Sequence, residues 1–184
     1  MKFFEQNFDF HILSSTQRTF VLENTSVISS LAKIGKLELL KEFSDVWTTA
    51  SVVEEVVDSE ISSIVESLSR ALSDWLEVST VVDIDSIQSI QENYPSLSYV
   101  DSSLIVFCQK NDAVLLTDDR RMLEVAEEQL DIDTYDLCEI LLALKNRDVI
   151  SRKEIGDIIE RLKKKDRYEF SKEDENRLKG EQSK

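Results

Sequence analysis

Several residue types are scarce in this chain of 184 residues, and each scarcity argues against a class of protein. The chain has one histidine, His11, and two cysteines, Cys108 and Cys138, which both stand among apolar neighbours. Cysteines placed in this way are typical of reduced core thiols, and a zinc site is not expected without paired ligands at suitable spacing. A single histidine without a partner motif also argues against a Ser-His-Asp triad.

Glycine and proline are rare too, with three and one residues respectively, which indicates long regular elements and few elaborate loops. No apolar run is long enough to span a membrane, and acidic residues come too early in M-K-F-F-E-Q-N-F-D for a secretory signal. P-loop, Rossmann and nucleophile-elbow motifs are missing as well. We therefore expect a cytoplasmic protein that does not contact membranes.

The net charge of −15 is distributed unevenly along the chain. Residues 145–184 carry 13 Lys and Arg against 10 Asp and Glu, so the remaining part of the chain is strongly acidic and the tail is mildly basic. An acidic body suits cation binding. It still permits a polyanionic substrate where a metal ion and local arginines screen the contact.

Hydrophobic periodicity predicts an alternation of strands and helices, which is typical of an α/β fold with a parallel sheet. The predicted strands are residues 19–22, 45–49, 77–82, 113–117 and 131–135. The predicted helices include residues 27–34, one long helix over 53–75, residues 84–90, 98–108, 122–130 and 137–144. We expect a three-layer α/β/α sandwich around a central sheet of about five parallel strands.

Three segments are expected in the domain organisation. Residues 1–18, which contain four phenylalanines, form an N-terminal arm or extra strand, and residues 19–147 form the α/β domain. Residues 148–184 form a C-terminal helical extension, because Ser151 and Glu154 match a capping box at the start of an amphipathic stretch.

The most informative stretch is A-V-L-L-T-D-D-R-R, from Ala113 to Arg121. A short apolar run suits a buried strand, and a helical pattern begins directly after the two aspartates. Asp118 and Asp119 then stand at the carboxyl edge of the sheet, where open α/β folds bind ligands. Two adjacent carboxylates favour a divalent cation, although helix capping by Asp119 explains the same residue equally well.

Similar polar side chains follow the other predicted strands or open the helices nearby. They are Glu23 with Asn24, Glu55 and Asp101. Because strand ends of a parallel sheet share one edge, these oxygen donors can converge with the aspartate pair, and such a set selects Mg²⁺ or Mn²⁺. Arg120 and Arg121 are placed to hold a phosphate-bearing substrate.

In four motifs the chain resembles the PIN domain, the fold of many metal-dependent ribonucleases, including VapC-type toxins. The motifs are V-L-E-N-T-S-V-I, S-V-V-E-E-V, S-Y-V-D-S-S-L-I-V-F-C and L-L-T-D-D-R-R-M-L-E-V-A. The N-T-S motif, followed by L-A-K-I-G-K-L-E-L-L, is similar to a prokaryotic, largely archaeal branch of this family.

The resemblance implies a role for each acidic position. Asn24, Asp101 and Asp119 fall on the metal-ligand positions, and Glu55 falls on the acid that completes the pocket. Asp118 would be a further catalytic carboxylate, with Thr117 and Glu23 as accessory residues, and Arg120 and Arg121 would contact RNA. The family usually has aspartate where Asn24 stands, and a neutral amide is a poorer ligand for Mg²⁺. Glu23 is adjacent, but successive strand residues point to opposite faces.

Two functions from different classes therefore stay open. The first is an Mg²⁺- or Mn²⁺-dependent endoribonuclease, the toxin of a toxin–antitoxin pair, with RNA as substrate, an antitoxin protein as partner, and a homodimeric state. The alternative is a PIN-fold protein impaired in catalysis that acts as an RNA-binding or assembly module. A phospho-acceptor receiver is disfavoured because no lysine follows the fifth predicted strand.

Overall fold

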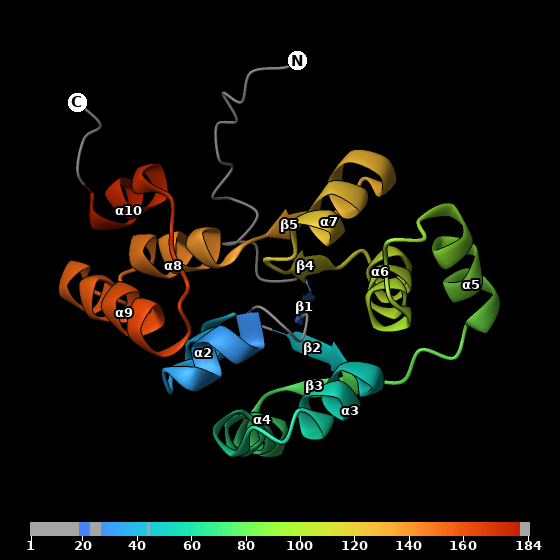
Figure 1. Ribbon diagram of the computed structural model, residues 1–184, viewed down its shortest axis with the longest axis horizontal. Coiled ribbons are helices and arrows are strands. Elements are labelled where there is room, and N and C mark those ends of the chain that lie inside the picture. The colour runs from blue at the N-terminus through green and yellow to red at the C-terminus, as the bar shows by residue number, and fades with distance from the viewer. Residues whose placement is uncertain (1–18, 23–26, 44, 181–184) are drawn as a thin grey trace.

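The computed structural model describes residues 19–22, 27–43 and 45–180. The predicted N-terminal arm, residues 1–18, lies outside the described residues. A five-stranded sheet in the order β3-β2-β1-β4-β5 forms the centre of the molecule, and every pair of neighbouring strands is parallel (Figure 1). The strands are β1 (Phe20–Leu22), β2 (Val46–Thr49), β3 (Glu77–Ser79), β4 (Val114–Leu116) and β5 (Thr134–Tyr135). The predicted α/β class with a parallel sheet of about five strands is confirmed.

Helices cover both faces of this sheet (Figure 1). One layer contains α2 (Ser29–Lys33), α4 (Ser62–Asp74), α8 (Leu137–Asn146) and α9 (Arg152–Lys165). The opposite layer contains α5 (Ile84–Asn93), α6 (Tyr99–Asn111) and α7 (Arg120–Leu123), which continues into a π-helical segment, Glu124–Gln129. The remaining helices are a 3₁₀ helix (Leu37–Glu42), α3 (Ala50–Asp58) and α10 (Lys172–Lys179). Within the described ranges, no helix is long and apolar enough to cross a bilayer.

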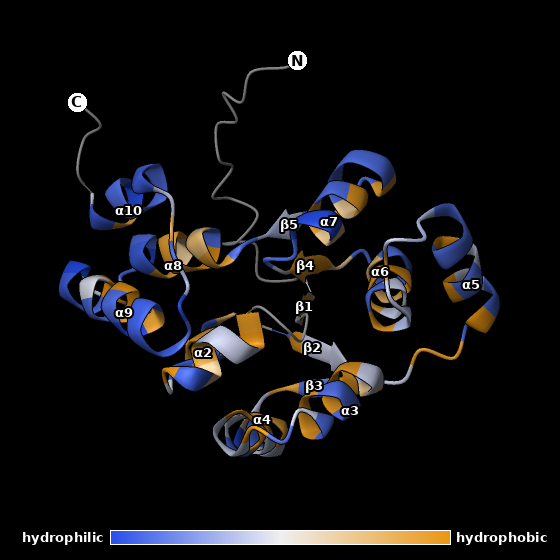
Figure 2. Cartoon of the chain, in the orientation of Figure 1, coloured by the Kyte–Doolittle hydropathy of each residue, from blue (hydrophilic) through white to orange (hydrophobic). Residues whose placement is uncertain are grey.

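The central strands are the most deeply buried part of the chain. Val21 and the whole of β4 are buried, as expected for strands that are covered on both faces. In Figure 2 this hydrophobic centre contrasts with the hydrophilic helix α10 at the periphery.

Helix α6 is buried along seven consecutive residues, Ser102 to Cys108. A helix that buries only one face alternates between buried and exposed residues. Both sides of α6 are covered, because it lies between the sheet and α5 (Figure 1). This burial fixes the position of the first turn of α6, which carries Asp101.

The single long helix predicted over residues 53–75 is wrong. The segment forms two helices, α3 and α4, because Glu60 between them adopts a left-handed backbone with φ of 55°. The apolar spacing predicted that Val57, Ile61 and Ile64 face the core together, but Val57 and Ile61 are 50% and 44% exposed, and only Ile64 of the three is buried. The apolar spacing continues across the break in the sequence, but α3 and α4 are separate helices and do not continue one buried stripe.

Two strands are shorter than their apolar runs indicated. The strand predicted over 77–82 ends at Ser79, and residues 80–83 continue without regular structure toward α5. The strand predicted over 131–135 begins only at Thr134, because Asp131 has a left-handed φ of 54° and the Ile132 N–H bonds back to the Ala126 carbonyl.

The C-terminal helices pack onto the rest of the domain. Helix α9 begins at the predicted capping box, in which the Ser151 side chain accepts from the Glu154 N–H and the Glu154 carboxylate accepts from the Ser151 N–H. Helix α9 packs against α2, and Lys33 of α2 forms an ion pair with Asp166, the residue that follows α9. In α10, Leu178 is fully buried, and the Lys145 ammonium bonds to the Leu178 carbonyl at 2.8 Å.

Candidate functional site

The candidate site is the carboxyl edge of the sheet, where β4 is followed by the sequence Thr117-Asp118-Asp119. Thr117 is fully buried, and its hydroxyl accepts a hydrogen bond from the Asp119 N–H at 3.0 Å. This local bond turns the chain away from the strand and sets the direction in which α7 begins.

Asp119 is the N-cap of α7. Its Oδ1 atom accepts from the Arg121 N–H at 2.8 Å and from the Met122 N–H at 3.2 Å. The capping interpretation of Asp119 therefore describes its present contacts. Capping does not prevent a carboxylate from also facing a cation, because each oxygen has more than one lone pair.

Asp101 also stands near a helix start, as the third residue of α6, whose N-cap is Ser98. It forms a capping box with Ser98: the Asp101 Oδ2 atom accepts from the Ser98 N–H at 2.8 Å, and the Ser98 hydroxyl accepts from the Asp101 N–H at 3.1 Å. Because α6 ends immediately before β4 begins, its first turn lies at the same edge as the carboxyl end of β4. Asp101 and Asp119 are therefore both anchored at helix starts along one edge.

A chain of hydroxyl groups joins α6 to the end of β2, which β1 separates from β4 in the sheet. The Thr49 and Ser51 hydroxyls lie 3.0 Å apart, and the Ser51 and Ser103 hydroxyls also lie 3.0 Å apart. These bonds connect the end of β2, the start of α3 and the first turn of α6. The sequence interpretation did not include these residues, although the pairs T-T and S-S beside the predicted acids were a usable signal.

Glu55 lies one helical turn after Ser51 on α3, so the two residues share a face of the helix. That face is the one on which Ser51 meets Ser103 of α6. Glu55 itself is exposed. The predicted convergence of Glu55 with Asp101 and Asp119 stays a prediction.

Asp118 makes contacts that differ from those of Asp119. Its Oδ1 atom accepts from the Leu137 N–H at 3.0 Å, at the start of α8, and from the Tyr168 hydroxyl at 3.1 Å. Burial, followed by the negative charge of Asp118, raises the pKa of the Tyr168 phenol. Sequence reasoning missed Tyr168 because it lies 50 residues from Asp118 and belongs to no motif.

Two further carboxyl groups stand beside Asp118 at the start of α8. Asp136 and Glu139 form a capping box, with the Asp136 carboxylate accepting from the Glu139 N–H at 2.8 Å. Burial and the neighbouring Asp136 charge raise the pKa of Glu139 to about 7, and burial raises the pKa of Asp136. This part of the edge therefore favours protonated carboxyl groups or a nearby positive charge.

Of the remaining predicted site residues, the two arginines are described by the structure, and Asn24 and Glu23 are not. Arg120 and Arg121 are exposed in the first turn of α7, beside Asp119. Asn24 and Glu23 belong to residues 23–26, which lie outside the described residues.

Two of the three predicted metal ligands, Asp101 and Asp119, belong to the described residues. Asp101 and Asp119 provide oxygen atoms, the donor type that Mg²⁺ and Mn²⁺ prefer. Among the residues that the structure describes, no group of three His, Cys, Asp or Glu side chains could hold a metal ion. A site of two carboxylates is compatible with Mg²⁺, which usually keeps several waters and takes one or two protein carboxylates.

A family model described as DUF3368, PIN domain, matches residues 20–179, which is most of the chain. The crystal structure of PAE2754 from Pyrobaculum aerophilum is similar in fold, with a TM-score of 0.51 and 13% sequence identity over 64% of this chain and 83% of that one. A search of curated proteins finds no significant match. The matched family model spans all five strands and the C-terminal helices, and the chain therefore belongs to the PIN domain family.

Proposed function

We propose that this protein is a metal-dependent endoribonuclease that hydrolyses phosphodiester bonds in RNA. The observation that supports the proposal is the placement of Asp101 and Asp119 at the starts of two helices along one sheet edge. PIN domains are generally nucleases, and the described part of the edge carries carboxylates as its candidate ligands.

In this proposal each residue of the edge has a defined task. Asp101 and Asp119, together with Asn24, hold Mg²⁺ or Mn²⁺, and Glu55 completes the acidic rim. The cation supplies positive charge that offsets the charge of the phosphate during hydrolysis. Arg120 and Arg121 bind neighbouring phosphates of the RNA. Asp118 holds the start of α8 and Tyr168 against the turn that carries Asp119.

The direct test is cleavage of RNA by the wild type and by Asp119→Asn, with and without Mn²⁺. Asparagine is as good an N-cap as aspartate, so the fold should persist while the ligand charge is lost. We expect cleavage to fall by roughly 100-fold or more, because even residues that only orient a ligand cost about 10- to 100-fold. Asp157→Asn, an exposed position on α9, is the matched control. Equal cleavage by wild type and Asp119→Asn would refute the proposed chemistry.

A second candidate is a PIN-fold module that binds RNA or assembles with partners without cutting. The neutral Asn24 at the usual aspartate position supports it. Millimolar Mn²⁺ should raise the thermal stability of an enzyme that binds the ion in its folded state, and should leave a module without a metal site unchanged. In the first case, Asn24→Asp should increase the shift because it adds a ligand charge.

A toxin role, an antitoxin partner and a homodimeric state extend the first proposal and are supported by the resemblance to VapC-type toxins. Expression of the wild type should then arrest growth of the host cell, and Asp119→Asn should not. Growth arrest by both proteins would separate toxicity from the proposed cleavage.

A further inference from the structure

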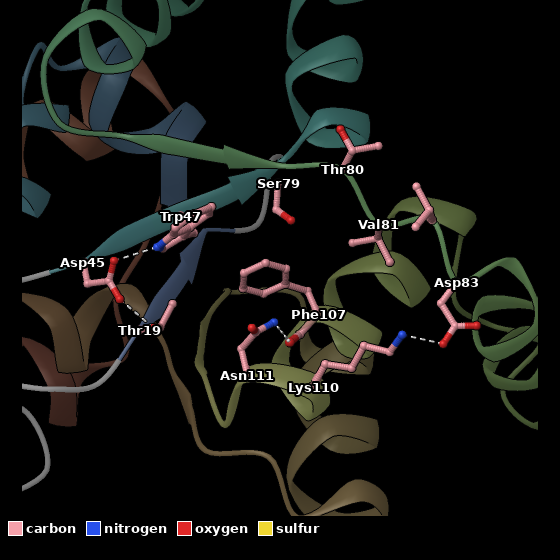
Figure 3. A pocket seen from close by; sticks show the side chains of 11 residues that line it. Thr19, Asp45, Trp47, Ser79, Thr80, Val81, Asp83, Phe107, Lys110 and Asn111 are labelled. Carbon is pink, nitrogen blue, oxygen red and sulfur yellow. Dashed lines mark hydrogen bonds and ion pairs between the residues drawn. The ribbon is translucent and has the colours of Figure 1, made fainter.

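A pocket of about 380 Å³ lies away from the candidate site, between β2, the connection from β3 to α5, and the last turns of α6 (Figure 3). It exists because α6 covers the centre of the sheet while α5 packs on α6, and neither helix fills the space over β2 and β3. Residues 80–83 close the outer side of this space as an irregular segment.

The pocket is separate from the acidic edge. Thr19 and Asp45, which line it, precede β1 and β2 and therefore stand at the amino ends of these strands. Ser79 and the residues after it line the other side of the pocket at the carboxyl end of β3, which β2 and β1 separate from β4 and the aspartates that follow it. Lys110, which also lines it, is nine positions after Asp101 on α6, which corresponds to about 14 Å along the helix axis. A ligand in this pocket would not occupy the candidate catalytic site.

One wall of the pocket is a fixed aromatic surface. The ring centroids of Trp47 and Phe107 are 6.0 Å apart with an interplanar angle of 33°. The Trp47 indole N–H donates to Asp45 Oδ1 at 2.7 Å, and the Thr19 hydroxyl donates to Asp45 Oδ2 at 2.7 Å. Asp45 has a left-handed φ of 66°, a conformation that aspartate adopts more readily than most residues with a side chain. The two hydrogen bonds that Asp45 accepts hold the indole in place.

The two ends of the pocket differ in charge. Asp45 provides a carboxylate at one end, beside the Trp47 ring, and Figure 3 shows Lys110 and Asp83 meeting at the other end. Lys110 Nζ lies 2.5 Å from Asp83 Oδ2 and is the one Lys or Arg of the pocket lining. An ammonium group has three N–H donors, so Lys110 can bind an anion while it remains paired with Asp83.

We infer that this pocket binds a nucleotide, with the base against Trp47 and Phe107 and the phosphate at Lys110. A planar ring suits the aromatic wall, because stacking on aromatic side chains accepts every base. Amino groups of a base can donate to Asp45, and the Lys110 ammonium, paired with Asp83 at the opposite end, has further N–H donors for a phosphate. The volume falls within the range of small-ligand sites.

Two sources of a nucleotide share this chemistry: a free mononucleotide and one nucleotide of a longer RNA strand. The chain has two tryptophans, Trp47 in the pocket and Trp75 outside it, and their indole N–H signals in a ¹H–¹⁵N spectrum report on the site directly. The probes are the four 5′-mononucleotides, adenosine, inorganic phosphate and a short oligoribonucleotide, each titrated into the full chain without added metal.

We expect a mononucleotide or the oligoribonucleotide to shift the Trp47 signal saturably and to leave Trp75 unchanged. A response to mononucleotides identifies the free form as sufficient, and a response to the oligoribonucleotide alone identifies an RNA strand. No saturable shift of Trp47 with any nucleotide, or equal shifts of both tryptophans, would overturn the inference.

Two lysine variants test the phosphate contact. Lys110→Gln should weaken nucleotide binding about tenfold and leave adenosine binding unaffected, because only the phosphate contact is lost. Lys41→Gln is the matched control, since Lys41 and Lys110 are 52% and 53% exposed and each pairs with an aspartate. Equal affinities in both variants would overturn the assignment of Lys110. Because this test measures binding without metal or cleavage, its result is independent of the nuclease proposal.

Discussion

Glu139 is the residue whose ionisation should couple most directly to folding. It closes the capping box of α8, and burial together with the charge of Asp136 raises its pKa from 4.5 to about 7. A raised carboxyl pKa means that the folded protein holds the proton more tightly than the unfolded chain. The stabilisation is complete below about pH 4.5 and is lost as the pH rises through about 7.

Glu139→Gln should remove most of this pH dependence, because the amide stays neutral and its oxygen can still accept from the Asp136 N–H. Relative to wild type, the variant should gain on the order of 2 kcal/mol in unfolding free energy between about pH 5 and about pH 8. Urea denaturation at several pH values measures this difference. Glu128→Gln, at an exposed position, should follow wild type. Parallel profiles for wild type and Glu139→Gln would show that Glu139 is ionised normally.

Single residues also mark the limit of sequence reasoning about the site. The positions of Asp101 and Asp119 at helix starts were predictable because each follows a recognisable pattern, a capping signal or a strand followed by a helix. The bond from Tyr168 to Asp118 was not predictable, since nothing in the sequence around Tyr168 indicates its partner. Contacts of this kind depend on how distant elements pack, which local patterns do not record.

At the level of secondary-structure elements, the helix starts connect stability with the candidate chemistry. Asp101 takes part in the capping box of α6 and is also a proposed metal ligand. Sequence periodicity predicted the strands and most helices because apolar spacing determines which face is buried. It failed at Glu60, because an ordinary side chain in a left-handed conformation gives no local signal for a break.

Two substitutions in α6 should separate the structural role from the chemical one. Ser98→Ala removes the acceptor of the Asp101 N–H and should lower the unfolding free energy by about 1 kcal/mol while RNA cleavage continues. Asp101→Asn keeps an oxygen acceptor for the Ser98 N–H and should cost less than about 1 kcal/mol, but it should reduce cleavage by roughly 100-fold or more. Denaturation and Mn²⁺-dependent cleavage measure the two effects. Loss of cleavage in proportion to stability in both variants would assign Asp101 a structural role alone.

At the scale of the whole molecule, the C-terminal segment, residues 148–184, was predicted to be an extension of the α/β domain. The predicted boundary after residue 147 stays a prediction. The contacts across it are extensive: α9 packs against α2, Leu178 is fully buried, and Tyr168 reaches Asp118 at the sheet edge. The segment therefore contacts α2, α8 and Asp118 of the candidate site, which are far apart in the sequence.

Tyr168→Phe tests this coupling because it removes one hydroxyl and keeps the ring, which packs 4.8 Å from Phe170. A hydrogen bond to a carboxylate contributes about 2 kcal/mol, and its loss leaves Asp118 with fewer donors in a half-buried position. If the C-terminal helices and the sheet form one cooperative unit, urea denaturation should show a single transition, and the unfolding free energy should be lower by that amount. Tyr99→Phe, at an exposed tyrosine, should shift it by less than about 0.5 kcal/mol. If the helices instead form a separate layer, the main transition should stay in place and only an early loss of helical signal should appear, because unfolding of the tail would then no longer require the sheet to open.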